Sequence, residues 1–547
     1  MSRIDPLPGR LGRRDLLKMT GAAAGVAALG DFTGRNVLPA RSALARQDAA
    51  NAIIFGVGTD IDELDPRTTD TQEGYIVASN VYDCLVLYDL GATTIRPGLA
   101  ESWEISEDGL VYTFNLRQGV SFHDGEPFNA DAVVTWYNSI DPDAADTQYD
   151  ATRMVYSADF ITNWIDTVEA VDESTVRMTL PDPYAPLLAN LAIPIAGIPS
   201  PAAIAQGLDH LATNPSGTGA FRLDSPDDWT RDSQMVLQAN PDYWGGAPKI
   251  EQFIVRVIPE SSTRLQSLEA GEIDIAWALI PEDVEKTRDN PDLVIVEAAG
   301  LNTNSVEFNV TKEPFTSKEV RQALNYAVNK EELSEGLYNG NMVAAGGVLP
   351  PVDWAFNPDL KSYPYDPDKA RELLTAAGYD ESNPLTFTFM AYTIPRGYNP
   401  AGDRLATAIQ EYWSEVGVQS DIQTGEWTQY RADRRAGLFA CDLYGWQGDN
   451  GDPDNFLATF FNSANKGGGN TSFYDNPEVD DLLVQAVRIS DMEERKALYH
   501  QAEQIVVDDA PWVFLGYQKH QVVTRANITD FQLQPTYIYY FAGVGKA

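Results

Sequence analysis

Residues 445–456, GWQGDNGDPDNF, are the part of the chain best suited to hold a charged ligand. They include three aspartates, three side-chain amides, three glycines and one proline. A rigid acidic loop between buried elements can bind one cationic group of a small molecule, because its carboxylates are held in place and partly shielded from water. The alternative is an acidic surface turn, since Asn-Gly and Asp-Pro are common turn dipeptides. Local chemistry leaves both interpretations open.

The segments that flank this loop predict the elements that position it. An apolar run at 438–444 predicts a strand before the loop. A helix is predicted after the loop, with Phe456, Leu457, Phe460 and Phe461 as its apolar residues.

Strands and helices are mixed along the rest of the chain. Strands are predicted at 111–117 and 176–180, the second with clean period-two alternation. One helix is predicted from the capping residue Asp366 to Gly378, and another over 402–416, which ends before a glycine. The pattern indicates an α/β fold.

Length and composition limit the number of domains. The chain has 547 residues and is 44% hydrophobic, which is too long for one core and predicts two or three compact units. It has no internal repeat and no long low-complexity linker, so we expect lobes folded closely together.

The N-terminus predicts an export signal over residues 1–45. Arg13 and Arg14 precede a short apolar run, and small residues at 43–45 suit cleavage, a pattern typical of a twin-arginine signal. The alternative is a disordered basic tail. No cysteine lies near the cleavage site, so we expect a freely soluble exported protein without a lipid anchor.

Net charge excludes two classes of partner. The signal holds 7 of the 39 Lys and Arg residues and 3 of the 80 Asp and Glu residues, so the mature chain carries 32 against 77, a formal charge of −45. Such a surface repels nucleic acid and anionic lipid.

The two cysteines, Cys84 and Cys441, both lie in apolar segments. Buried free thiols are the expectation, and a disulfide in an oxidising compartment is the alternative.

Long ordered motifs resemble those of one protein family. From about residue 50 onward the chain is similar to periplasmic dipeptide-binding proteins of ABC importers, which carry a GWxGDNGDPDNF segment. The resemblance also rests on RPGLAESWEISEDGLVYTFNLRQGVSFHDGEPF (96–128), NPSGTGAFRL (214–223), NPDYWGGAPKIEQF (240–253), VRQALNYAVNKEEL (320–333) and YDPDKARELLTAAGY (365–379).

The resemblance implies a two-lobed periplasmic-binding-protein-like α/β fold with an inserted subdomain. The first lobe is expected to combine 50–85, 214–297 and 517–547. The inserted subdomain is expected at 86–213. The second lobe is expected at 298–516 and would carry the main ligand contacts.

It also implies roles for two charged residues. Asp449 matches the aspartate that meets the peptide α-amino group, and Arg396 matches an arginine that meets the peptide carboxylate. Gly397 replaces a proline of the family's Arg-Pro-Tyr-Asn-Pro stretch. Taken alone, Arg396 fits a solvated loop arginine equally well. As a pair, the two charges would select the length of the peptide by their separation. They would discriminate little between peptides that differ only in their side chains.

Six further residues are expected at the ligand. Tyr398 would line the pocket or pack beneath its loop, and Trp446 would stack on a ligand side chain or belong to the core. The remaining four are Gly448, Asp70, Thr71 and Gln72. Family members carry small hydroxyl or glycine residues at the positions of 70–72, so this departure leaves the length and the chemistry of the peptide open.

Asp452 and Asp454 are expected to cap and brace the acidic loop. Calcium is not expected there, because Phe460 falls at the twelfth position, where an EF-hand loop needs a bidentate glutamate.

The sequence predicts no enzyme, cofactor or metal. Its four histidines are scattered, and CxxC, Walker A, HExxH and GxSxG motifs are lacking. We expect a monomeric receptor that binds short peptides, with dipeptides favoured, and delivers them to a membrane ABC permease. The alternatives are a binder of haem, nickel chelate, glutathione or oligosaccharide, and an exported peptide or sugar hydrolase.

Overall fold

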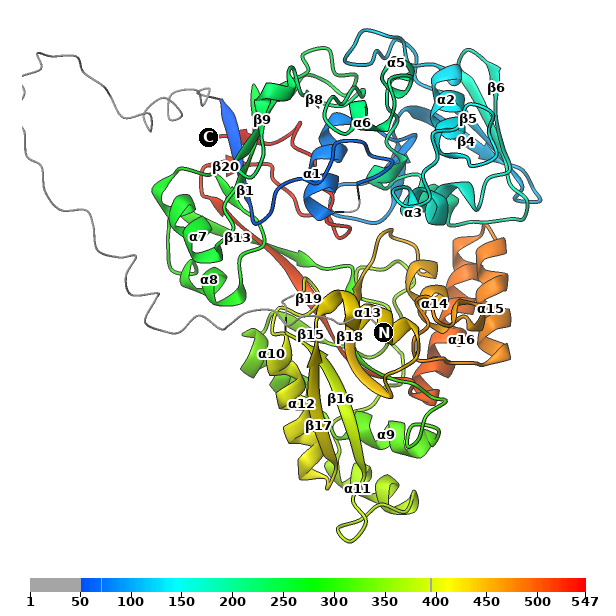
Figure 1. Cartoon of the computed structure of the whole chain (residues 1–547), viewed down its shortest axis with the longest axis vertical. Coiled ribbons are helices and arrows are strands. Elements are labelled where there is room, and N and C mark those ends of the chain that lie inside the picture. Colours follow the sequence, from blue (N-terminus) through cyan, green and yellow to red (C-terminus); the bar gives the residue numbers. More distant parts are fainter. Residues whose placement is uncertain (1–50, 70, 394–395) are drawn as a thin grey trace, which may run out of the picture. The chain divides into compact units, whose positions relative to one another are not determined.

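Strand β19 (Trp512–Arg525) joins the two halves of the main sheet (Figure 1). The computed structural model describes residues 51–69, 71–393 and 396–547. β19 pairs antiparallel with β13 through its second half and with β14 through its first half. Because it is continuous, it connects strands from distant parts of the chain within one hydrogen-bonded sheet.

In the described residues the main sheet has thirteen strands, in the order β17-β16-β18-β14-β19-β12-β1-β11-β10-β8, with β13 and β15 paired to β19 and β9 paired to β10. Their bounds are β1 (Ala52–Val57), β8 (Phe221–Arg222), β9 (Trp229–Thr230), β10 (Gln234–Ala239), β11 (Gln252–Val257), β12 (Ile275–Ala276), β13 (Leu293–Ala299), β14 (Asn302–Phe308), β15 (Met342–Ala344), β16 (Thr386–Tyr392), β17 (Gln419–Gly425) and β18 (Cys441–Gln447).

A separate four-stranded sheet lies within residues 100–179, in the order β4-β5-β7-β6. Its strands are β4 (Ala100–Ile105), β5 (Val111–Leu116), β6 (Thr167–Asp172) and β7 (Thr175–Thr179). β5 and β7 confirm the two strands predicted in this region. Two short pairs complete the described strands: β2 (Val86–Tyr88) with β3 (Ile95–Pro97), and β20 (Ile528–Thr529) with β21 (Gly545–Lys546).

The principal helices are α1 (Gln72–Val81), α2 (Ala130–Ile140), α7 (Ser261–Ala270), α8 (Pro281–Lys286), α9 (Lys318–Tyr326), α10 (Lys330–Tyr338), α11 (Pro367–Ala376), α12 (Asp403–Glu415), α13 (Trp427–Arg435), α14 (Asp454–Phe461), α15 (Pro477–Arg488) and α16 (Met492–Asp509). Several helices begin at a side chain that caps them, among them α1, α2, α9, α10, α11 and α16. The short ones include α3 (Val155–Ser157), the π-helix η4 (Ala158–Thr162), α4 (Leu187–Asn190), η5 (Pro194–Ala196), α5 (Pro201–Ile204) and α6 (Leu208–Leu211).

Helices α11 and α12 match their predictions closely. The Asp366 side chain caps α11 by accepting from the N–H of Lys369. Gly378 and Gly417 follow the two helices with φ of 92° and 90°, a conformation that glycine adopts without steric penalty.

The predicted strand before the acidic loop begins later than expected. β18 starts at Cys441, and Leu438 is 61% exposed. Gly437 has a φ of 66° and ends the preceding helix, so residues 438–440 belong to the connection between helix and strand. α14 confirms the predicted helix after the loop, and its four apolar residues are buried.

Cys84 and Cys441 are both free and buried, which confirms the expectation of unpaired thiols. Among the described residues, no helix is both long and apolar enough to cross a membrane. The predicted export signal lies outside the described residues.

Candidate ligand-binding site

The candidate site lies at one edge of the main sheet. β16, β17 and β18 run parallel to one another, so the loops that follow them leave the same edge. Arg396 lies in the loop after β16 and Asp449 in the loop after β18, while Trp427 begins α13 directly after β17. In open α/β sheets, ligands bind in the crevice beyond the carboxyl ends of the strands.

A buried charge cluster holds β18 in place. Arg434 from α13 donates from Nε to Asp442 and from Nη2 to Glu307, both at 2.6 Å. Its guanidinium also lies 3.3 Å from the ring centroid of Tyr444. Burial raises the pKa of both carboxyls, and the positive charge of Arg434 opposes that rise. The strand that leads into the acidic loop is therefore tied to β14 and α13.

The acidic loop organises its own side chains around Asn455. The Asn455 amide oxygen accepts from the backbone N–H of Asp449 at 3.0 Å and from the Trp446 indole at 3.2 Å. Its amide nitrogen donates to the Asp449 carboxylate at 3.3 Å. The N–H of Gly448 donates to the carbonyl of Leu301 at 2.8 Å. These hydrogen bonds fix the orientation of the Asp449 carboxylate, which is partly buried. Among the described residues, no cation forms an ion pair with it.

Asp452 and Asp454 have structural partners. Asp452 forms a buried ion pair of 2.7 Å with Arg495 of α16 and accepts from the N–H of Asp454. The Tyr184 hydroxyl donates to the Asp454 carboxylate at 3.4 Å. Both contacts agree with the bracing role expected from the sequence.

A small pocket of about 20 Å³ adjoins Asp449. Five separate chain segments line it: Gln72 and Tyr75 from α1, Phe160 from η4, Ile193 and Pro194, the Gly448–Asp449 pair, and Thr536 with Ile538. This volume holds about one water molecule. A ligand larger than a water molecule therefore needs the surrounding segments to move apart.

Two residues that line this pocket have a buried polar atom without a partner in the described part of the chain. These atoms are Gln72 Oε1 and Thr536 Oγ1. Unsatisfied buried acceptors and hydroxyls are rare in folded proteins, and they are expected where a ligand supplies the missing donor or acceptor. Sequence analysis identified Gln72 but missed Thr536, Tyr75, Phe160, Ile193, Pro194 and Ile538. No local motif distinguishes these six.

Asp449 itself has a perturbed acidity. Burial raises its pKa to about 7; the hydrogen bond from Asn455 opposes the rise, and the nearby negative charge of Asp159 adds to it. A carboxyl in this state is readily ionised when a cation arrives, because the cation stabilises the charged form.

Arg396 does not line the pocket at Asp449. Its guanidinium lies 4.4 Å from the ring centroid of Trp427, a cation–π contact. Asn399 fixes the loop through its buried side chain, which accepts from Tyr338 at 2.9 Å and donates to Tyr392 at 3.1 Å. The loop packs on β18, since a Cβ on Gly397 would lie 3.0 Å from the side chain of Gln447.

The other expected contact residues have different surroundings. Tyr398 is buried, with its ring 6.1 Å from that of Tyr444. Trp446 packs edge-on against Phe460 at 5.5 Å. Thr71 caps α1, accepting from the Gly74 N–H and donating to Asp62 at 2.7 Å. Asp70 lies outside the described residues.

The acidic loop also contacts the segment 86–213. Asn450 donates to the Asn190 side chain at 2.6 Å, and the N–H of Gly451 donates to the Tyr88 hydroxyl at 3.1 Å. A Cβ on Gly451 would overlap Thr93, so glycine permits this close approach.

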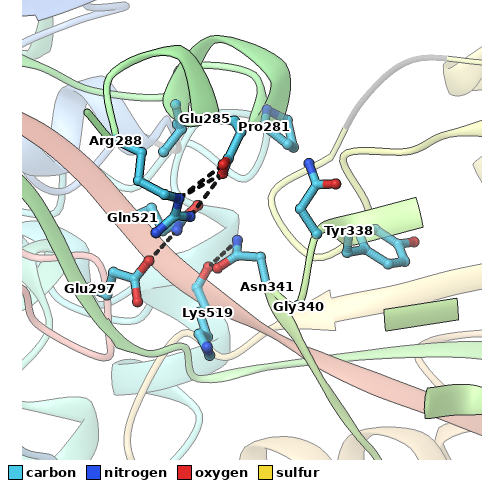
Figure 2. Close-up of a pocket in the computed structure, with 11 residues that line it drawn as sticks. Pro281, Glu285, Arg288, Glu297, Tyr338, Gly340, Asn341, Lys519 and Gln521 are labelled. Carbon is cyan, nitrogen blue, oxygen red and sulfur yellow. Dashed lines mark hydrogen bonds and ion pairs between the residues drawn. The ribbon is translucent and has the colours of Figure 1, made fainter. Parts of the chain in front are cut away.

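A larger pocket, of about 380 Å³, lies elsewhere and contains none of the expected ligand residues (Figure 2). Figure 2 shows Arg288 directed at Glu285 and Gln521 at Glu297. Asn341 donates to the carbonyl of Lys519. Arg288, Gln521 and Asn341 thus donate to neighbouring oxygens, while Asn341 Oδ1 is buried without a partner among the described residues.

Comparison with known proteins defines the class. Residues 94–468 match the model of bacterial extracellular solute-binding proteins, family 5. The "Heme-binding protein A" of Haemophilus influenzae is 37% identical over 450 residues, covering 80% of this chain and 81% of the relative. The "Dipeptide-binding protein" of Escherichia coli is 35% identical over 479 residues, covering 85% and 88%.

A solved structure gives the same result. The chain superposes with a TM-score of 0.75 and 33% identity on the ABC transporter-associated periplasmic binding protein DppA of Helicobacter pylori in complex with the peptide STSA, covering 90% of this chain and 98% of that one. The fold is thus the mixed α/β, two-lobed fold of solute-binding proteins, as expected. The chain belongs to family 5 of the bacterial extracellular solute-binding proteins.

Proposed function

We propose that this chain is the exported receptor of an ABC importer, and that it binds short peptides with free termini, dipeptides above all. The observation that carries the proposal is Asp449, a partly buried carboxyl without a cation, beside unpaired acceptors on Gln72 and Thr536. A peptide α-ammonium group has three N–H donors and one positive charge, which match these acceptors.

Arg396 is proposed to bind the peptide carboxylate. Its support is the common sheet edge, since the loops after β16 and β18 emerge side by side. The Arg396 guanidinium would have to turn away from Trp427 and toward the ligand. Two of its N–H groups would then donate parallel hydrogen bonds to the peptide carboxylate. Peptide length would then be set by the separation between Asp449 and Arg396.

The proposal also covers the boundaries of the lobes, the route of export and the membrane partner. We place one lobe at 50–85, 214–297 and 517–547, the inserted subdomain at 86–213, and the second lobe at 298–516. Sheet topology supports the division, because the four-stranded sheet lies within the proposed inserted segment and β19 pairs with strands from both proposed lobes, β13 and β14. Export would follow the twin-arginine signal at 1–45 into the periplasm, and a membrane permease would receive the peptide from the monomeric receptor.

Binding without turnover is part of the proposal. The residues at Asp449 provide acceptors for a peptide terminus but no paired nucleophile and base for its amide bond. A dipeptide incubated with the protein should be recovered intact by chromatography. Hydrolysis that is lost in Asp449→Asn would make the loop catalytic.

Calorimetry tests the ligand class. A dipeptide should bind, and acetylation of its amino end should weaken binding about 30-fold to several-thousand-fold, as for the loss of one buried charge partner. Equal affinity for both peptides would contradict the role of Asp449. Mass spectrometry of the ligand that co-purifies with the protein would identify the natural peptide.

Haem is the second candidate, because a relative 37% identical is named for haem binding. Absorbance titration separates the two candidates. A saturable Soret shift that survives in Asp449→Asn, without peptide binding in the wild type, would favour haem.

A further inference from the structure

Lys330 is a buried cation with no carboxylate partner. It is the first residue of α10 and is 4% exposed. Its ammonium group donates to the carbonyl of Ala345 at 2.9 Å. Among the described residues it has no other hydrogen bond and forms no ion pair.

A buried ammonium group of this kind is unfavourable without compensation. Removing a charge from water costs several kcal/mol in real proteins, and one neutral carbonyl replaces only part of its hydration. Burial accordingly lowers the pKa of Lys330 to about 8, against the small opposing effect of the Glu331 charge.

A pocket of about 300 Å³ lies beside this lysine. Its walls are the start of α10, residues 344–346 after β15, and residues 362–365. This size falls at the lower end of the range for small-molecule sites. It shares no residue with the pocket at Asp449.

Ser362 lines the same pocket. Its Oγ is buried and makes no hydrogen bond to any described residue. Ser362 lies close to the glycine turn after β15, since a Cβ on Gly346 would be 3.9 Å from the Ser362 Cβ. The pocket is therefore lined by Lys330, whose ammonium group has two N–H donors beyond the one bonded to Ala345, and by a serine with an unpaired hydroxyl.

The plain alternative is a structural lysine that ties α10 to the segment after β15. That role explains the bond to Ala345. It leaves the adjoining cavity, the two unused N–H groups and the unpaired Ser362 hydroxyl without a purpose.

We propose that Lys330 and Ser362 form a binding site for a small oxyanion, a carboxylate or a phosphate. The oxyanion would accept from the Lys330 ammonium and the Ser362 hydroxyl, and its charge would compensate the buried cation. The amino end of α10 adds a favourable dipole at the same place. The acidic surface of the chain opposes entry of an anion, and salt screens that repulsion beyond about 10 Å.

Calorimetry and thermal melting of the full protein test this site. The probes are sodium acetate and sodium phosphate, each compared with sodium chloride at equal ionic strength. Saturable binding and a higher Tm are expected for acetate, phosphate or both, and the tighter of the two identifies the source of the oxyanion.

Three variants distinguish a specific anion-binding site from general electrostatic attraction of anions to the surface. Lys330→Met keeps the length of the side chain and should weaken binding about 30-fold or more. Ser362→Ala should weaken it by about 2- to 13-fold and serves if Lys330→Met does not fold. Lys361→Met removes an exposed neighbouring lysine and should leave affinity unchanged.

Absence of saturable binding, or equal binding in wild type and Lys330→Met, would overturn the proposal. An equal loss in Lys361→Met would do the same, since it would show general surface attraction. Dipeptide affinity should be unchanged in Ser362→Ala, because the two pockets have no residue in common.

Discussion

Asp449 is in an environment that suits a ligand better than it suits the unliganded protein. Burial raises its pKa to about 7, so in the folded chain it binds a proton more tightly than an unfolded aspartate does. Between about pH 4 and about pH 7 the folded state therefore holds more protons, and stability falls as pH rises through this range.

The first prediction concerns Asp449→Asn, which keeps the hydrogen-bonding shape and removes the ionisable group. Dipeptide affinity should fall about 30-fold to several-thousand-fold, because the ligand ammonium loses its buried counter-charge. The unliganded variant should melt higher than wild type at about pH 8 and not at about pH 4, because only the ionised carboxyl is unfavourable there. A variant with lower Tm at both pH values and unchanged affinity would contradict this account.

Affinity should also depend on pH in a defined direction. Below about pH 7 the Asp449 carboxyl must lose a proton before it binds an ammonium group, so dipeptide affinity should rise by up to about tenfold per pH unit toward neutrality. Above about pH 8 it should fall as the peptide amine deprotonates. Calorimetry across this range checks the profile, and in Asp449→Asn the acidic limb should disappear.

A different outcome is expected for Asp452→Ala. Its removal leaves Arg495 buried without a counter-charge, which should lower the free energy of unfolding by about 3–5 kcal/mol. Chemical denaturation measures this loss. If Asp452→Ala abolishes peptide binding while stability stays unchanged, the ligand-binding role belongs to Asp452 and its assignment to Asp449 is wrong.

At the scale of elements, the acidic loop connects two parts of the fold. It follows β18, begins α14 and meets Tyr88 and Asn190 in the segment 86–213. Both contacts are made between protein residues only. They should therefore hold the acidic loop against the segment 86–213 when a peptide is bound, without touching the peptide.

The Tyr88 hydroxyl provides a test with a matched control. Tyr88→Phe removes the acceptor for the Gly451 N–H and should weaken dipeptide affinity by about 2- to 13-fold, chiefly through faster dissociation. Tyr112→Phe removes a buried hydroxyl that donates to Tyr184 within the segment 86–213, and should lower Tm without changing affinity. Stopped-flow kinetics and melting curves compare the two; equal affinity losses would rule out a specific role for this contact.

At the scale of the whole molecule, the site must open to admit its ligand. The pocket beside Asp449 holds only about 20 Å³, and five separate chain segments line it. Closure of lobes about a few hinge residues is a known way to bury a small ligand. β19 and the turn between β13 and β14 are the connections where such a rotation would occur.

Small-angle scattering tests this motion. The radius of gyration should be smaller with a saturating dipeptide than after the ligand has been removed by mild denaturation and refolding. Asp449→Asn, which binds weakly, should keep the larger radius at the same peptide concentration. An unchanged radius in the wild type would indicate a receptor that is already closed without ligand.

The sequence alone determined the class and much of the local structure. Its long motifs identified the family, and capping signals at Asp366, Gly378 and Gly417 placed two helices within a few residues, because caps act over a single turn. It also singled out the acidic loop. The start of β18 was missed, since exposure of Leu438 depends on where the preceding helix ends in space.

Only the tertiary structure brought Gln72, Phe160, Asp449 and Thr536 to one pocket. Successive members of this set are 87 or more positions apart in the sequence, and no local periodicity marks a side chain that is polar, buried and unpaired. For the same reason the pocket at Lys330 could not be predicted from the sequence, in which Lys330 resembles any other helix residue. Burial and missing partners are properties of packing between distant segments, so they appear only when the chain has folded.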